Sequence, residues 1–370
     1  MGHDTICCLI PVKLELLDRL IYPEYYHTVD GATLLMNKRK VEDGLGTLLQ
    51  ELFGVDTRVK DFEDITVGWE TQIIAFRLQP RDGKALDLVI RIYSTGAGWK
   101  AEREFNVMRR LGAVGYPVPI VYVYDASGET LGSPFIIMER ITGGTLWDVF
   151  FASPRDRYDE VLALNARLMA QLHEIPPTKV LSRVRRLRRR SRILERVQDE
   201  SRELNEHGLK AVFDPLINWL IENSKSLSKS PACLIHQDLH PRNILLRPDG
   251  SPVVIDWASC TVGDFREDLC WTALLAGTFI DAYLKKTVYN SYGSVSAREL
   301  VDLPYFEAYS GLRRLADAAL TMKVGATSRG MRSEALNEIE KNRPHYSKVL
   351  SNVVEATGAS MPGLDRVLGV

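Results

Sequence analysis

Hydrophobic spacing predicts that the chain is rich in strands from about residue 61 to 141. Leucines recur at helical spacing from Val41 to Phe53 and Gly54 follows, which predicts an amphipathic helix. The apolar period then shortens toward two, which is typical of strands. We expect strands at 65–67, 73–78, 86–92, 120–124 and 135–141, with one helix at 101–111 between the third and the fourth.

After two glycines at 143 and 144 the pattern becomes mostly helical. We expect helices at 158–175 and 211–223, a short β-rich segment at 234–257, and helices again from about residue 265. A sheet-rich part followed by a helical part predicts an α+β fold with a cleft between two lobes. The expected divisions are an unassigned extension (1–40), a small lobe (41–142) and a larger lobe (143–370).

An arginine-rich segment, 181–200, contains eight arginines against three acidic residues. Its apolar residues keep helical spacing, which predicts a basic amphipathic helix. Two interpretations remain open: a solvated helix face, or a patch that binds an anionic substrate group or an acidic partner.

Composition limits the possible partners and metal sites of the chain but does not indicate a function. The 370 residues carry a formal net charge of −1, so the whole chain offers no electrostatic argument for binding nucleic acid or a membrane. The five cysteines show no metal-ligand spacing, which favours free thiols. We expect no leader peptide and no membrane span, and therefore a cytoplasmic protein, monomeric or dimeric.

The segment from His236 to Asp256 carries the candidate chemistry. Asp238 and Asn243 lie five residues apart, and Asp256 follows at the end of an apolar run. Phosphoryl transfer requires a positioned acceptor hydroxyl and a divalent cation on the phosphates. We therefore expect Asp238 to face the hydroxyl, while Asn243 and Asp256 supply the oxygen ligands that Mg²⁺ prefers.

The run HQDLHPRN, followed by IDW and then GDFREDL, resembles the aminoglycoside phosphotransferase and choline kinase family, which are small-molecule kinases of the protein-kinase-like superfamily. The resemblance covers about residues 41–320. It implies a bilobal fold, with a small antiparallel-sheet lobe and a mostly helical lobe. ATP or GTP with Mg²⁺ would donate the γ-phosphoryl to a small-molecule hydroxyl. It also implies that Asp264 braces the catalytic loop and that His236 is structural. The role of His240 stays open between contact with the phosphate, contact with the acceptor, and neither.

The resemblance further assigns the nucleotide contacts. Gly68 would lie in a turn over the phosphates, with Thr71 where asparagine is usual. Arg91 occupies the position of the kinase strand lysine, and its counter-ion would be Glu104, or otherwise Glu102. Gly143 and Gly144 would permit movement of the lobes. The residues implied around the base are Met138, the backbone of Glu139 and Ile141, Leu245 and Ile255.

The acceptor is not fixed by the sequence. Aminoglycoside-, choline-, sugar- and macrolide-like hydroxyl compounds all belong to the family's range. Carboxylates would favour a polycation, and aromatic rings would favour a quaternary ammonium. The candidate acceptor residues are Trp257, Glu267, Trp271, Asp281, Tyr283, Glu307 and Tyr309.

Three other functions compete. A silent nucleotide-binding pseudokinase is suggested by the unusual Arg91 and Thr71. A protein kinase shares the catalytic loop, but the step from IDW to GDFREDL leaves no room for an activation loop. A binding module that works through the arginine-rich segment is the third.

Overall fold

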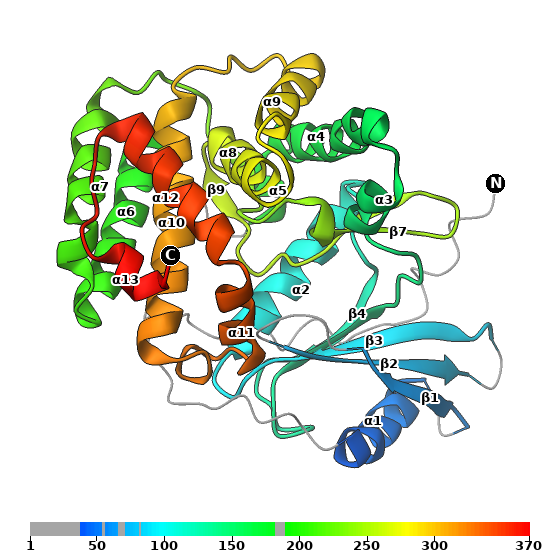
Figure 1. Ribbon diagram of the computed structural model, residues 1–370. Coiled ribbons are helices and arrows are strands. Elements are labelled where there is room, and N and C mark those ends of the chain that lie inside the picture. Colours follow the sequence, from blue (N-terminus) through cyan, green and yellow to red (C-terminus); the bar gives the residue numbers. More distant parts are fainter. Residues whose placement is uncertain (1–37, 54–55, 66–70, 81–82, 182–188) are drawn as a thin grey trace. The chain divides into compact units, whose positions relative to one another are not determined.

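The computed structural model describes residues 38–370 except 54–55, 66–70, 81–82 and 182–188 (Figure 1). These residues belong to one compact unit, Gly31–Val370. Gly68 therefore lies outside the described residues. The predicted strand at 65–67 is wrong at Ile65, which follows a strand rather than beginning one, and its other two residues are not described.

A five-stranded sheet forms the N-terminal lobe, defined here as residues 38–142. Its strands lie in the order β1-β2-β3-β5-β4, and each neighbouring pair is antiparallel. The elements of this lobe are α1 (Lys38–Phe53), β1 (Arg58–Asp64), β2 (Gln72–Gln79), β3 (Leu86–Ile92), α2 (Gly98–Ala113), β4 (Val121–Asp125) and β5 (Phe135–Glu139).

Helices cover both faces of this sheet. Val41, Leu45 and Leu49 of α1 are fully buried and pack with alternate residues of the strands, including Ile74 and Ile90. Residues of the opposite face, such as Ala75 and Val89, join the cluster that includes buried residues of α2. Burial on both faces explains the nearly continuous apolar residues of the central strands β2, β3 and β5.

The C-terminal lobe, residues 143–370, is mostly helical, as the sequence predicts (Figure 1). Two short antiparallel pairs frame the chemistry-bearing segment: β6 and β9 flank it, and β7 and β8 lie within it. The elements are α3 (Leu146–Ala152), α4 (Tyr158–Glu174), α5 (Pro177–Val180), α6 (Arg189–Glu206), α7 (Lys210–Asn223), β6 (Cys233–Ile235), β7 (Ile244–Leu246), β8 (Pro252–Val254), β9 (Thr261–Gly263), α8 (Phe265–Leu275), the π-helical turn η5 (Ala276–Ile280), α9 (Leu284–Val295), α10 (Leu303–Val324), α11 (Glu334–Lys341), α12 (Arg343–Thr357) and α13 (Leu364–Leu368), with 3₁₀ turns η2 (Arg155–Arg157), η3 (Ser224–Ser226), η4 (Pro241–Asn243) and η6 (Thr327–Arg329).

The predicted arginine-rich helix is only partly right. Leu181 is outside a helix, residues 182–188 are not described, and α6 begins at Arg189. One of its arginines, Arg196, forms an ion pair with the buried Glu267, so this part of the segment is anchored to the lobe. Separately, no helix among the described residues is both long enough and apolar enough to cross a membrane.

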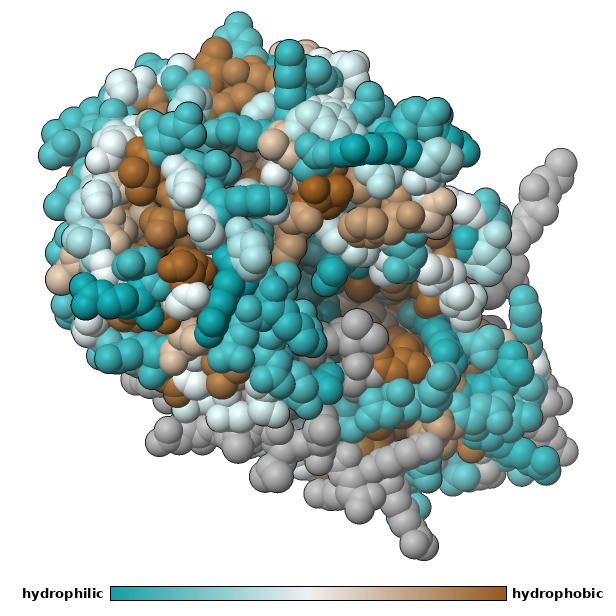
Figure 2. Space-filling view, viewed as in Figure 1, coloured by the Kyte–Doolittle hydropathy of each residue, from teal (hydrophilic) through white to brown (hydrophobic). Residues whose placement is uncertain are grey.

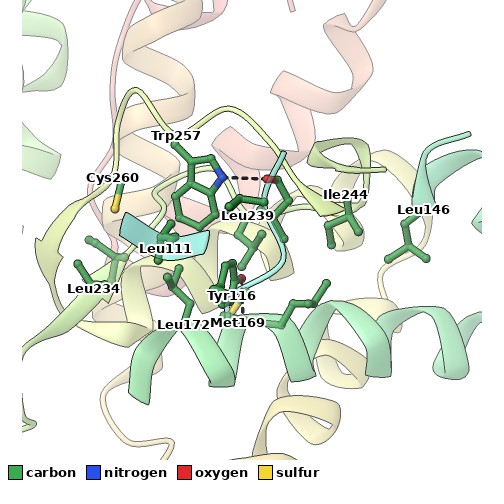
Figure 3. Close-up of a cluster of buried hydrophobic side chains, with 14 of the residues drawn as sticks. Leu111, Tyr116, Leu146, Met169, Leu172, Leu234, Leu239, Ile244, Trp257 and Cys260 are labelled. Carbon is green, nitrogen blue, oxygen red and sulfur yellow. Dashed lines mark hydrogen bonds between the residues drawn. The ribbon is translucent and has the colours of Figure 1, made fainter. Parts of the chain in front are cut away.

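A cluster of buried hydrophobic side chains packs around the chemistry-bearing segment and supports it (Figure 3). Trp257 is fully buried, its ring meets Tyr116 edge-on at 5.6 Å, and its Nε1 donates to the carbonyl of Val254 at 2.9 Å. Leu234 and Leu239, which bracket the start of the catalytic segment, belong to the same cluster. Trp257 is therefore a core residue, and the expectation that it binds the acceptor is wrong.

Candidate active site

One buried carboxylate holds the loop at residues 236–243, which carries the candidate catalytic residue Asp238. Asp268 in α8 accepts hydrogen bonds from the backbone N–H groups of His236 at 2.8 Å and Gln237 at 2.6 Å. Its other neighbour is His173 of α4, whose Nε2 lies 3.3 Å from Oδ2. Burial acts to raise the pKa of Asp268, but the bond from His173 and the nearby charges and N–H groups outweigh it, so its pKa is lowered.

This arrangement corrects one expectation from the resemblance. Asp264 does not brace the loop: it caps α8 by accepting from Arg266 N, and it forms a buried ion pair with the Arg266 guanidinium at 2.9 Å. A carboxylate at a helix N-terminus satisfies otherwise unpaired N–H groups, which explains its burial there. The bracing residue is Asp268, one helical turn later, where the side chain turns toward β6.

The loop backbone is bent to present Asp238. Gln237 has a φ of +72°, which is uncommon for a residue with a side chain. His236 is fully buried: its Nδ1 accepts from Asp238 N at 3.2 Å and its Nε2 donates to the carbonyl of Ile255 at 2.9 Å. With one ring nitrogen bonded to the backbone of Asp238 and the other to that of Ile255, the buried imidazole orders the loop. His236 thus occupies the structural place that we expect for it.

Three donors surround the carboxylate of Asp238. Trp271 Nε1 donates to Oδ1 at 2.7 Å, and Asn243 Nδ2 donates to Oδ2 at 3.1 Å. His240 Nε2 lies 3.3 Å from Oδ1, while its Nδ1 accepts from Arg242 N. Burial acts to raise the pKa of Asp238, but His240, His236 and the Trp271 bond lower it far below its usual value. Asp238 is therefore held as an anion.

Asn243 and Asp256 are brought to one place by the backbone. The Ile255 N–H donates to the carbonyl of Asn243 at 3.0 Å, so Asp256 follows directly after a residue bonded to Asn243. The Asn243 amide nitrogen binds both the carbonyl and the carboxylate of Asp238, which leaves its amide oxygen for a cation. Asp256 has a φ of +70° and a side chain that is 39% exposed. These oxygens could hold Mg²⁺ together with phosphate and water oxygens.

The described residues include no cluster that would hold a metal ion by protein side chains alone. Within the described ranges, no group of three or more His, Cys, Asp or Glu side chains is placed to hold a metal ion. A protein site of that kind is typical of zinc. Mg²⁺ needs fewer protein ligands, because substrate phosphates complete its shell.

An ion-paired cluster links β3, α2 and Asp256. Arg91 donates from Nη1 to Glu104 Oε1 at 2.9 Å and from Nη2 to Asp256 Oδ1 at 3.0 Å. Glu104 is fully buried and also accepts from Tyr93 and from Trp257 N. Burial acts to lower the pKa of Arg91, but both carboxylates raise it well above its usual value. Glu104 is therefore the partner of Arg91, in preference to Glu102.

One atom of this cluster fits a phosphate ligand. Arg91 Nε is buried and has no hydrogen-bond partner in the part of the chain that the structure describes. A buried unpaired donor costs free energy, on the order of 1–3 kcal/mol. A phosphate oxygen would satisfy it, and guanidinium geometry suits phosphate.

The residues expected around a nucleotide base are mostly apolar and half-buried or buried. Met138 is 8% exposed and pairs across the sheet with Val89, while Leu245 and Ile255 are half-buried. Glu139 differs from the expectation of a backbone role alone, since its carboxylate pairs with Arg247 and accepts from Ile120 N. Thr71 is buried and precedes β2.

The first of the two glycines after β5, Gly143, has a steric role. A Cβ on Gly143 would lie 1.7 Å from the carbonyl oxygen of Leu246, and Gly144 O accepts from Leu246 N at 2.9 Å. The segment therefore packs directly on β7, which only glycine at position 143 permits. Figure 2 shows a hollow, bordered by both hydrophilic and hydrophobic residues, in the face between the sheet and the helical lobe.

Most of the expected acceptor residues are already engaged. Glu267 and Tyr309 are each 2% exposed, so the expectation that they bind the acceptor is wrong. Asp281 pairs with Arg155, and Glu307 pairs with Lys285 and Tyr289. Tyr283 is 43% exposed. Trp271 contacts Asp238 itself, a role that its helical position in GDFREDLCW did not reveal.

Sequence comparison adds the family. The pattern of the phosphotransferase enzyme family matches residues 61–315. Acyl-CoA dehydrogenase family member 11 of Rattus norvegicus is 28% identical over 180 residues, and that of Homo sapiens is 26% identical over 183 residues. Each alignment covers 47% of this chain, but the matched part spans only 23% of either relative.

Solved phosphotransferase structures have the same fold as this chain. A protein of Ralstonia eutropha JMP134, provisionally assigned as an aminoglycoside phosphotransferase, has a TM-score of 0.63 at 18% identity, over 85% of this chain and 98% of that one. The gentamicin complex of APH(2″)-IIa has a TM-score of 0.56 at 16% identity, over 88% and 100% of the two chains. The expected protein-kinase-like fold, with an antiparallel-sheet N-terminal lobe, is confirmed. This chain belongs to the phosphotransferase enzyme family, the family of aminoglycoside phosphotransferase-like enzymes that its catalytic-loop motif resembles.

Proposed function

We propose that this protein transfers the γ-phosphoryl group of ATP or GTP to a hydroxyl of a small molecule. The observation that carries the proposal is the environment of Asp238: a carboxylate fixed by Trp271, Asn243 and His240 beside Asp256 and its partner Arg91. Membership of the phosphotransferase enzyme family supports the reaction class.

Asp238 acts in this proposal as an orienting anion. An ionised carboxylate has about four acceptor positions, and three donors of the protein use three of them. The remaining position can accept a hydrogen bond from the acceptor hydroxyl and align its oxygen for in-line attack. The lowered pKa makes Asp238 a weak base, which suits a loose transition state that needs little early proton removal.

The nucleotide would be held from both lobes. Arg91 would donate to the phosphates, with Glu104 fixing the guanidinium. Gly68 and Thr71 would lie near the phosphates, and Met138, Glu139, Ile141, Leu245 and Ile255 would surround the base. Asn243 and Asp256 would hold Mg²⁺, which supplies charge neutralisation on the phosphates when bound.

The acceptor need not be a polycation. Two carboxylates that could attract one, Asp281 and Glu307, are each paired with a basic side chain, and Glu267 is buried. Neutral and anionic hydroxyl compounds therefore belong in a screen beside aminoglycosides and choline. Hydroxyacyl thioesters join it because the matched relatives are members of an acyl-CoA dehydrogenase family.

The test is nucleotide consumption by the purified chain with Mg²⁺ against that panel, with product identified by mass spectrometry. We expect a phosphorylated acceptor that Asp238→Ala no longer forms, while the exposed Asp249→Asn, in the turn between β7 and β8, retains activity. Nucleotide binding without turnover on the whole panel would favour the pseudokinase. Absence of nucleotide binding would refute the proposal.

A further inference from the structure

Arg313 in α10 is a partly buried arginine whose contacts do not form an ion pair. No carboxylate among the described residues lies within ion-pair distance of it, although its charge acts on the partly buried Glu200; its Cζ lies 4.5 Å from the ring centroid of Trp271. Its Nη1 and Nη2 also lie 3.4 Å and 3.3 Å from the carbonyl oxygen of Gln237. A guanidinium over an indole face is an attractive contact, and the same planar group can donate from its edge.

Both contacts lead to the same carboxylate. Trp271 Nε1 donates to Asp238 Oδ1 at 2.7 Å, and Gln237 is the residue before Asp238. The peptide at Gln237 is held on both sides: Asp268 accepts its N–H and Arg313 approaches its carbonyl. Since Gln237 has a φ of +72°, surrounding contacts must keep it in that conformation.

We propose that Arg313 is a positioning residue for Asp238, acting through the Trp271 ring and the Gln237 carbonyl. This inference rests on the proposed function, in which Asp238 orients the acceptor hydroxyl. Without Arg313, the indole and the loop peptide would each lose one contact, and the Asp238 carboxylate would sample more orientations. Misplacement of an orienting group lowers the rate of the chemical step more than it weakens nucleotide binding.

The next residue supplies a matched control. Arg314 lies on the same helix but faces another region: its Nε donates to His345 Nε2 at 3.0 Å, and it stacks on Phe279 and Tyr346 at 5.5 Å and 4.8 Å. Within the described part of the chain, Arg314 makes no hydrogen bond to Trp271 or Gln237 and does not stack on the Trp271 ring. Arg314→Met therefore removes an equivalent cation without touching the support of Asp238.

The first arm needs no acceptor. In a heteronuclear NMR spectrum the six tryptophans give six indole N–H signals, and Trp271→Phe identifies one of them. We expect Arg313→Met to speed solvent exchange of the Trp271 indole N–H by about 10-fold, the order expected when a bond to a carboxylate weakens. Arg314→Met should leave it unchanged. Equal protection in wild type and Arg313→Met would overturn the inference.

The second arm is a double-mutant cycle on phosphoryl transfer. We expect Arg313→Met to lower kcat about 10-fold with little change in the KM for nucleotide, and Arg313→Lys to recover part of it. In a Trp271→Phe background, Arg313→Met should lower kcat about 3-fold or less, because the contact through the indole is already lost. Additive losses would contradict the inference. If wild type transfers nothing, the proposed function fails, while indole exchange still decides the role of Arg313.

Discussion

Asp238 and Asp256 are the two carboxylates of the candidate site, and their side chains are equally exposed at 39%. Their surroundings differ. Asp238 is held entirely by the C-terminal lobe, through Trp271 and Asn243 and an imidazole. Asp256 is held by Arg91, which comes from β3 of the N-terminal lobe and is shared with Glu104.

The comparison separates two roles that exposure alone would not distinguish. Donors that are already in place keep Asp238 anionic and leave one position for a hydroxyl. Asp256 is paired with Arg91 of the other lobe, and in the proposed function its carboxylate holds the cation. Asp238 would therefore keep its geometry if the lobes moved, whereas the Asp256 pair would depend on their separation.

The largest expected effect comes from Asp238→Asn. An amide donor in place of one carboxylate oxygen would face Trp271 or Asn243, and the hydroxyl would lose its anionic partner. We expect kcat to fall about 1,000-fold, within the range for an oriented acid–base group. Nucleotide affinity, measured by calorimetry, should stay near that of wild type. A loss below 10-fold would break the distinction between the two carboxylates.

Asp268→Asn tests the support of the catalytic loop. The variant places an amide against backbone N–H groups of His236 and Gln237, so we expect the free energy of unfolding to fall by about 3 kcal/mol. Asp264→Asn, at the cap of the same helix, is the matched comparison for bracing, and its kcat loss should be smaller. A greater kcat loss in Asp264→Asn would restore the role expected from the motif.

The same residue gives a pH dependence. Because folding lowers the pKa of Asp268, its ionised form stabilises the protein above the unfolded value of about 4, and this contribution is lost as the pH falls below it. The difference in unfolding free energy between wild type and Asp268→Asn should therefore shrink on acidification from pH 7 toward pH 3. Chemical denaturation at a series of pH values measures it.

Asp256→Asn tests whether Asp256 is the carboxylate that binds the metal. We expect kcat to fall about 100-fold and the Mg²⁺ concentration for half-maximal activity to rise, because a metal ligand is lost. Asp238→Asn should not shift that concentration. Titration of activity with Mg²⁺ in both variants measures this concentration. An equal increase in the two variants would mean that Asp238 and Asp256 share one role.

The smallest expected effect is that of Arg91→Lys. The positive charge opposite Glu104 remains, so we expect little loss of stability. The lysine cannot donate to Glu104, Asp256 and a phosphate with the geometry of the arginine fork, and the KM for nucleotide should rise about 10-fold. Arg77→Lys, at an exposed ion pair in β2, is the control. An unchanged KM would remove Arg91 from the phosphate site.

Local sequence determined most of the regular elements and the position of the candidate catalytic loop. Apolar spacing predicted β3 at its observed bounds and α4 to within one residue, because these elements bury regular faces. It missed α3, whose seven residues are too few to show a period, and misplaced the first strand. The spacing of Asp238, Asn243 and Asp256 predicted a shared site because two short strands between them return the chain to one place.

Only the tertiary structure decided which neighbours those residues have. Asp268, not Asp264, holds the loop, because the direction of each side chain on α8 depends on how that helix packs against β6. Trp271 and Arg313 meet Asp238 and Gln237 from segments 33 and 76 residues away. Trp257 and Glu267 are removed from the acceptor by burial. Hydrophobic period reports which face of an element is buried, but contacts between distant elements are fixed by packing alone.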